Sequence, residues 1–184
     1  MTQRRIYQQE HPYFITFRTR EGWPAFEDRE MAGLMADIIF NAGRLKWFDV
    51  LAYQIMPDHV HVLVYRMDGN AGGDTRVREV QNFHALPPQV SAPAVIIKSA
   101  PVKENNVSQL MYCIKSYFIK RIRVQYNIPY SIWHTRFYTR IVDTQQYLHT
   151  VIHYIQYNPV KAKLPEKYQK FPYQYFDWRL ISKL

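Results

Sequence analysis

The stretch of sequence that decides the fold runs from residue 48 to residue 66 and reads FDVLAYQIM-PD-HVHVLVYR. Both halves are rich in β-branched and aromatic residues, which favour strands. The dipeptide Pro57-Asp58 between them is a common turn signal. The pattern therefore predicts two strands, over residues 48–56 and 59–66, joined as a hairpin.

Elements on both sides of this hairpin complete an α+β pattern. Residues 11–19 (HPYFITFRT) predict a strand, and apolar residues at helical spacing predict a helix over residues 26–46. Residues 107–126 predict an amphipathic helix capped by Ser108, and residues 132–142 (IWHTRFYTRIV) predict a fourth strand. The order β-α-β-β-α-β predicts a ferredoxin-like (RRM-like) antiparallel sheet, with helices on one face and the other face open.

One further helix is expected after the fourth strand. Asp143 or Thr144 is a suitable cap for its first turn, and the helix is expected to run to about Tyr157 because Pro159 follows. Residues 67–106 contain several glycines and prolines, and they are expected to be an insertion or flexible loop.

The composition narrows the class of protein. A length of 184 residues fits a single domain, residues 1–184, and 47% hydrophobic with 16% aromatic residues excludes a wholly disordered chain. The one cysteine, Cys113, excludes an intramolecular disulfide and a cysteine-based zinc cluster. No apolar stretch approaches the length of a membrane span, and the N-terminus has no apolar signal core. We therefore expect a cytoplasmic protein without a membrane partner.

The positive charge is concentrated in the second half of the chain. The whole chain has 24 Lys and Arg against 15 Asp and Glu, a net charge of +9. Residues 1–97 hold 10 basic and 11 acidic residues, net −1, whereas residues 98–184 hold 14 and 4, net +10. A basic segment interleaved with aromatic residues suits nucleic acid, although it also suits a solvated surface that keeps the protein soluble. Candidate phosphate contacts are Lys115, Lys120, Arg123, Arg136, Arg140 and Lys161.

Two histidines in the hairpin form the first candidate site. Because side chains alternate along a strand, His59 and His61 share one face, and Val60, Val62 and Val64 share the other. Two imidazoles at this spacing can bind one divalent metal and leave positions for a third protein ligand, water and a substrate phosphate. The alternative is a pair of exposed histidines that bind no metal.

The last helix carries the second candidate site. Tyr154 and Asn158 are one helical turn apart, so their side chains can converge on one point. A tyrosine hydroxyl can act as a covalent nucleophile, particularly where a metal polarises the electrophile. The alternatives are an ordinary half-buried tyrosine, and an asparagine that caps the helix C-terminus before Pro159.

These residues resemble a known family. Residues 53–63 (YQIMPDHVHVL) resemble the HUH segment, His-hydrophobic-His, of the single-tyrosine transposases. Residues 133–138 (WHTRFY) and 153–161 (HYIQYNPVK) resemble the REP-associated tyrosine transposases, which are related to the insertion-sequence-200-like transposases. The likeness covers about residues 11–176, apart from residues 67–106.

The resemblance implies an enzyme that cleaves and rejoins single-stranded DNA, often beside a hairpin. It implies that His59, His61 and Asn158 bind Mg²⁺ or Mn²⁺ and that Tyr154 is the nucleophile. Attack by Tyr154 would give a 5′-phosphotyrosine link and a free 3′-hydroxyl. The implied partner is single-stranded or hairpin DNA, and the implied protein is a monomer or a homodimer.

The residues leave two other functions open. The chain could be a non-catalytic relative that only binds nucleic acid. It could also be a metal-dependent phosphoesterase that uses His59 and His61 with water as the nucleophile. The strongly basic second half argues against the phosphoesterase, because a small substrate does not need it.

Overall fold

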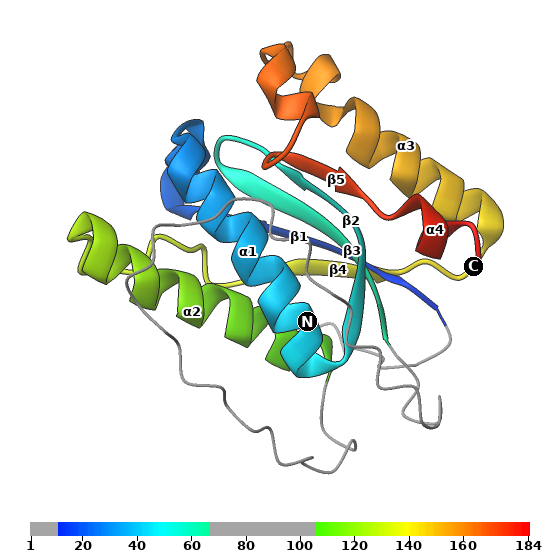
Figure 1. Cartoon of the computed structure of the whole chain (residues 1–184), viewed down its shortest axis with the longest axis horizontal. Helices are drawn as coiled ribbons and strands as arrows, with labels where there is room; N and C mark the ends of the chain where they lie inside the picture. Colours follow the sequence, from blue (N-terminus) through cyan, green and yellow to red (C-terminus); the bar gives the residue numbers. More distant parts are fainter. Residues whose placement is uncertain (1–10, 67–105) are drawn as a thin grey trace. The chain divides into compact units, whose positions relative to one another are not determined.

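The predicted hairpin lies within a five-stranded antiparallel sheet (Figure 1). Strands β2 (Phe48–Ile55) and β3 (His59–Arg66) pair with each other, close to the predicted bounds. The computed structural model describes residues 11–66 and 106–184, and both stretches belong to the same unit of the chain. The expected insertion at residues 67–106 therefore lies outside the described residues, except for its last position.

The other strands extend the sheet on both sides. Strand β1 (Tyr13–Arg18) pairs with β3, and β4 (Tyr138–Ile141) pairs with the other side of β1. The order β4-β1-β3-β2 is that of the predicted ferredoxin-like fold, which is confirmed. A fifth strand, β5 (Gln174–Phe176), pairs with β2 at the opposite edge and was not predicted.

Two helices cover one face of the sheet (Figure 1). Helix α1 (Arg29–Lys46) begins later than expected, because residues 25–27 form a 3₁₀ turn and the Asp28 side chain accepts hydrogen bonds from the first turn of α1. Helix α2 (Val107–Tyr126) has the predicted bounds. Its cap is Asn106 rather than the predicted Ser108, since the Asn106 side chain accepts from the backbone N–H of Gln109.

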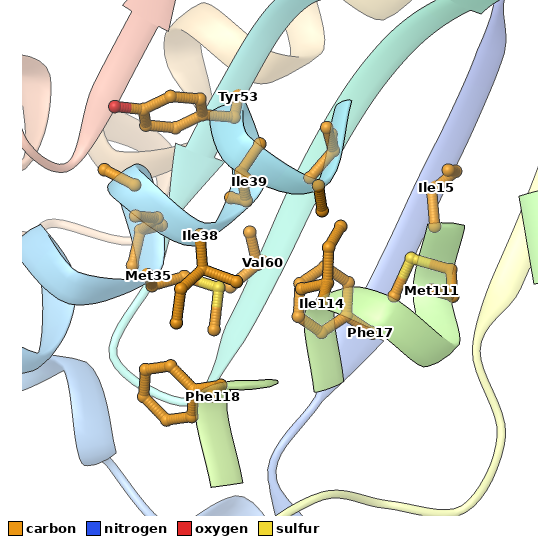
Figure 2. Close-up of a cluster of buried hydrophobic side chains, with 14 of the residues drawn as sticks. Ile15, Phe17, Met35, Ile38, Ile39, Tyr53, Val60, Met111, Ile114 and Phe118 are labelled. Atoms are coloured by element: carbon orange, nitrogen blue, oxygen red, sulfur yellow. The ribbon is translucent and has the colours of Figure 1, made fainter. Parts of the chain in front are cut away.

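The main core fills the space between these helices and the sheet. Val60, Val62 and Val64 of β3 are buried in it, as the alternation predicts. Figure 2 shows side chains of α1 and α2, including Met35 and Phe118, packed beside residues of β1, β2 and β3. Trp133 and Met56 are also buried.

Phe118 is the residue of α2 whose truncation should cost most stability. Its side chain is fully buried. The centroid of its ring lies 5.7 Å from the ring centroid of Phe26 and 5.3 Å from that of Trp133. Phe118→Ala is expected to lower the free energy of unfolding by about 3 to 5 kcal/mol, because it removes buried apolar surface and leaves a cavity. Urea titration followed by circular dichroism measures this change. A loss below about 1 kcal/mol would contradict the packing described.

The second face of the sheet is partly covered by α3 (Gln145–Lys161), not fully open as expected. Helix α3 begins at Thr144, one of the two predicted caps, and packs its apolar stripe on the sheet. The buried residues of this contact are Phe14, Leu51, Ala52 and Leu63 of the sheet, Val142 just after β4, and Leu148, Val151, Ile152 and Ile155 of α3. The expected end at Tyr157 was wrong. The helix continues past Pro159, because a proline removes only one backbone N–H and Ala162 then donates to the carbonyl of Asn158.

The predicted strand over residues 132–142 was wrong in its first half. Only an isolated bridge between Thr19 and Trp133 precedes β4. The Lys115 ammonium donates to the backbone carbonyls of His134 and Arg136, at 2.9 and 3.3 Å, so these carbonyls bind a side chain rather than a neighbouring strand.

The remaining short elements are the 3₁₀ turns at Arg20–Gly22 and Glu166–Gln169 and the helix α4 at Trp178–Ile181. No helix within residues 11–66 and 106–184 is long and apolar enough to cross a membrane.

Candidate functional site

Packing of α3 on the sheet brings the two sequence-predicted sites together. The Tyr154 hydroxyl lies 3.3 Å from Nε2 of His61, although 93 residues separate them in the chain. The His59 and His61 rings are 4.8 Å apart between centroids. Because the buried stripe of α3 fixes its rotation on the sheet, Tyr154 lies beside the histidine pair of β3.

Each imidazole is oriented through its Nδ1 atom. Nδ1 of His61 lies 2.8 Å from the hydroxyl oxygen of Thr16, and Nδ1 of His59 lies 2.6 Å from the Asp58 carboxylate. With the proton on Nδ1, both rings donate to these oxygens. The lone pair of each ring then lies on Nε2, and the His61 lone pair faces Tyr154.

The surroundings of His61 keep it neutral. Its side chain is only 3% exposed, and Phe14 stacks on it at a centroid distance of 5.6 Å. Burial, with a smaller contribution from His59, lowers the pKa of His61 to about 3. A neutral imidazole is the form that can bind a metal or accept a hydrogen bond. Tyr154 is 42% exposed, so a large substrate can reach its hydroxyl.

Asn158 follows Tyr154 by one turn inside α3. It is not a helix cap, because the cap position is Ala162. Its Nδ2 atom is buried and has no hydrogen-bond partner among the described residues. Within those same residues, no three His, Cys, Asp or Glu side chains gather into a possible metal site. A third protein ligand beside the two histidines would therefore be of another type, such as the Asn158 amide.

Four of the six candidate phosphate contacts line one groove. This groove, of about 920 Å³, lies between α2 and residues 131–137. Lys115, Lys120, Arg123 and Arg136 line it together with Arg20, and no acidic residue among residues 11–66 and 106–184 does. Arg140 on β4 and Lys161 at the end of α3 lie outside this lining. The structure thus brings together the basic residues of α2 and the following loop, and it separates the other two.

Sequence reasoning missed three polar or aromatic residues near the histidine pair. The register of the sheet places Arg18 opposite His59, Thr16 opposite His61, and Tyr138 on the other side of Thr16. Alternation along residues 13–18 does put Thr16 and Arg18 on one face. It does not say which face, because that depends on pairing with β3, more than 40 residues away.

Comparison with known proteins extends the assignment of the fold. A comparison with models of protein families gives no match, and a comparison with curated protein sequences gives none. Among solved structures, the REP-associated tyrosine transposase bound to a REP hairpin matches 95% of this chain and 81% of its own, with a TM-score of 0.62 and 19% identity. A candidate transposase from Deinococcus radiodurans R1 matches 84% of this chain and 95% of its own, with a TM-score of 0.46 and 16% identity. The chain therefore has the fold of a REP-associated tyrosine transposase.

Proposed function

We propose that the protein is a single-stranded DNA transposase or nuclease that cleaves and rejoins DNA through a covalent link to Tyr154. The observation that carries this proposal is the 3.3 Å distance between the Tyr154 hydroxyl and Nε2 of His61. The partly exposed Tyr154 hydroxyl thus lies beside His61, and the Nδ1 atoms of both His61 and His59 already face an oxygen. The solved structure with the same fold, bound to a REP hairpin, supports DNA as the substrate.

The residues present fit a divalent metal. His59 and His61 offer Nε2 lone pairs, and each Nδ1 faces an oxygen that holds the ring, a common arrangement around metal-binding histidines. The Nδ2 atom of Asn158 is buried and lacks a hydrogen-bond partner among the described residues, and a half-turn of the amide would present its oxygen in the place of that nitrogen. We therefore assign Mg²⁺ or Mn²⁺ to His59, His61 and Asn158. When bound, such an ion polarises the scissile phosphate and offsets the charge that develops on it.

The chemical step that we propose conserves the number of phosphate ester bonds. The Tyr154 oxygen forms a bond to phosphorus while the bond from phosphorus to the 3′ oxygen breaks. The phenolic proton is lost, and the departing 3′ oxygen takes up a proton and becomes a hydroxyl. The product is a 5′-phosphotyrosine, and attack by the same or another 3′-hydroxyl reverses the step without ATP.

The basic groove supports a polyanionic substrate. Between Glu104 and Asp143 the sequence contains no acidic residue and six basic ones. Four of these six line the groove, where they can neutralise the phosphates of a nucleic acid strand. A small phosphate ester would not need so extended a basic surface.

The decisive experiment is a search for the covalent product. The purified full-length protein is incubated with Mn²⁺ and an end-labelled single-stranded oligonucleotide that contains a hairpin, and the mixture is resolved on a denaturing gel. We expect a labelled species that survives denaturation and disappears on protease treatment. Binding without this species at any metal concentration would favour a non-catalytic relative, and turnover without it would favour a phosphoesterase.

Thr16 provides a test of how the histidine pair is oriented. Thr16→Val keeps the shape of the side chain but removes the oxygen that faces Nδ1 of His61. We expect Mn²⁺ affinity to fall by about 10- to 100-fold, the usual effect of losing a partner of a metal-binding histidine. Calorimetric titration of Mn²⁺ measures it, and Thr16→Ser, which keeps the hydroxyl, is expected to bind as the wild type does. Equal affinity in Thr16→Val would show that this hydrogen bond does not orient a ligand.

A further inference from the structure

The sheet face that carries the histidine pair has a second polar and aromatic region beside it. Directly opposed residues of neighbouring strands point to the same face. Arg18 is opposite His59, and Tyr138 is opposite Thr16, which is itself opposite His61. Arg140 is opposite Phe14, so it shares this face as well. We call Arg18, Tyr138 and Arg140 the edge strip.

Helix α3 leaves the edge strip accessible. The buried residues that pack with α3 are Phe14 of β1, Leu51, Ala52 and Leu63 of β2 and β3, and Val142 just after β4, and none of them belongs to the edge strip. Tyr138 is 46% exposed, and Arg18 and Arg140 are exposed. The edge strip is therefore an open surface that begins next to His59 and His61 and continues to the β4 edge.

The side chains of the edge strip suit a nucleic acid strand. The guanidinium carbon of Arg140 lies 5.5 Å from the centre of the Tyr138 ring. An exposed tyrosine ring can stack on a base of any sequence, and a guanidinium beside it can bind the adjoining phosphate. In a duplex the bases are already stacked on each other, so this chemistry selects an unpaired strand.

We propose that the edge strip binds the unpaired DNA strand next to the phosphate that Tyr154 attacks. In this arrangement Tyr138 stacks on one base, and Arg18 and Arg140 contact the phosphates on either side. Neighbouring strands are about 5 Å apart, so Tyr138 on β4 lies roughly 10 Å across the sheet from the histidines of β3. A short run of nucleotides spans that distance. The inference rests on the proposed function, because it names how the same site holds its substrate.

The test is a binding measurement that does not depend on cleavage. Fluorescence anisotropy in EDTA gives the Kd of the full-length protein for a labelled 20-nucleotide oligothymidylate and for a blunt duplex. We expect Tyr138→Ala to weaken single-strand binding roughly tenfold and to change duplex binding less than twofold, whereas Tyr138→Trp retains single-strand affinity. The matched control is Trp178→Ala, which removes an exposed aromatic side chain near the opposite, β5, edge of the sheet and should change neither Kd.

Either of two results would overturn the inference. One is an unchanged single-strand Kd in a Tyr138→Ala protein whose thermal unfolding matches the wild type. The other is an equal loss of single-strand and duplex binding. The outcome is separable from that of the covalent-product experiment. If no adduct forms but Tyr138→Ala still loses single-strand affinity, the proposed DNA binding by the edge strip is supported and the proposed reaction is contradicted. If the adduct forms and Tyr138→Ala binds single-stranded DNA as the wild type does, the proposed reaction is supported and the proposed DNA binding by the edge strip is contradicted.

Discussion

Replacing Tyr154 by phenylalanine is expected to abolish the covalent protein–DNA product. The change removes only the hydroxyl oxygen that lies 3.3 Å from Nε2 of His61, and it keeps the ring that packs edge-on against Phe14. The fold should therefore be unaffected, while the rate of strand cleavage should fall by at least about 10⁴-fold, as expected when a nucleophile is lost. Denaturing gels of labelled oligonucleotide measure both the adduct and the cleaved strand.

A nearby tyrosine supplies the matched control. Tyr157 lies three residues further along α3 and is about as exposed as Tyr154, but its ring lies against that of His153, with 4.4 Å between the ring centroids. Tyr157→Phe is therefore expected to form the adduct at the wild-type rate. If Tyr154→Phe still formed the adduct, or if Tyr157→Phe lost it, the nucleophile would be misassigned.

Loss of the histidine pair is the second large effect that we expect. His59→Ala and His61→Gln each remove an Nε2 lone pair of the proposed metal site, and glutamine at position 61 keeps most of the buried volume. Cleavage in Mn²⁺ should fall by about 10³-fold or more, since a bound metal contributes several kcal/mol to the transition state. Calorimetric titration should show the loss of Mn²⁺ binding in the same variants.

Controls for the histidine variants come from α3. His149 and His153 are exposed on this helix, and neither belongs to the histidine pair of β3. His149→Ala is expected to retain both Mn²⁺ binding and cleavage. Full cleavage by the wild type in EDTA, or normal Mn²⁺ binding by His61→Gln in a folded protein, would contradict the metal assignment.

The parts of the fold that could be predicted are those with strong local patterns. The alternation in residues 59–66 and the turn at Pro57-Asp58 place β3 accurately, and the amphipathic period of residues 107–126 marks α2 to the residue. Strand β5 escaped prediction because three residues carry too short a pattern, and they pair only because β2 offers a free edge. The irregular course before β4 likewise depends on a distant side chain, Lys115 of α2.

The same division applies to the candidate site. His59, His61, Tyr154 and Asn158 stand in recognisable local motifs, so the sequence alone could name them. Thr16 and Arg18 could not be found in that way, and although Tyr138 ends the WHTRFY segment, nothing in that segment gives it a role beside the histidines. Their relevance comes from the register of β1 against β3 and β4, and sequence patterns do not determine the register between distant strands.

The path of the chain around α3 has a consequence for how the reaction centre is assembled. The polypeptide leaves the sheet at one edge, β4, crosses the face as α3, and returns to pair at the opposite edge as β5. The Gln174 side chain of β5 donates both to Gln54 of β2 and to the backbone carbonyl of Gln156, two residues after Tyr154. The tyrosine helix is thus tethered at both of its ends to the sheet that carries its histidines. Moving α3 onto a second molecule would therefore require β5 to unpair from β2.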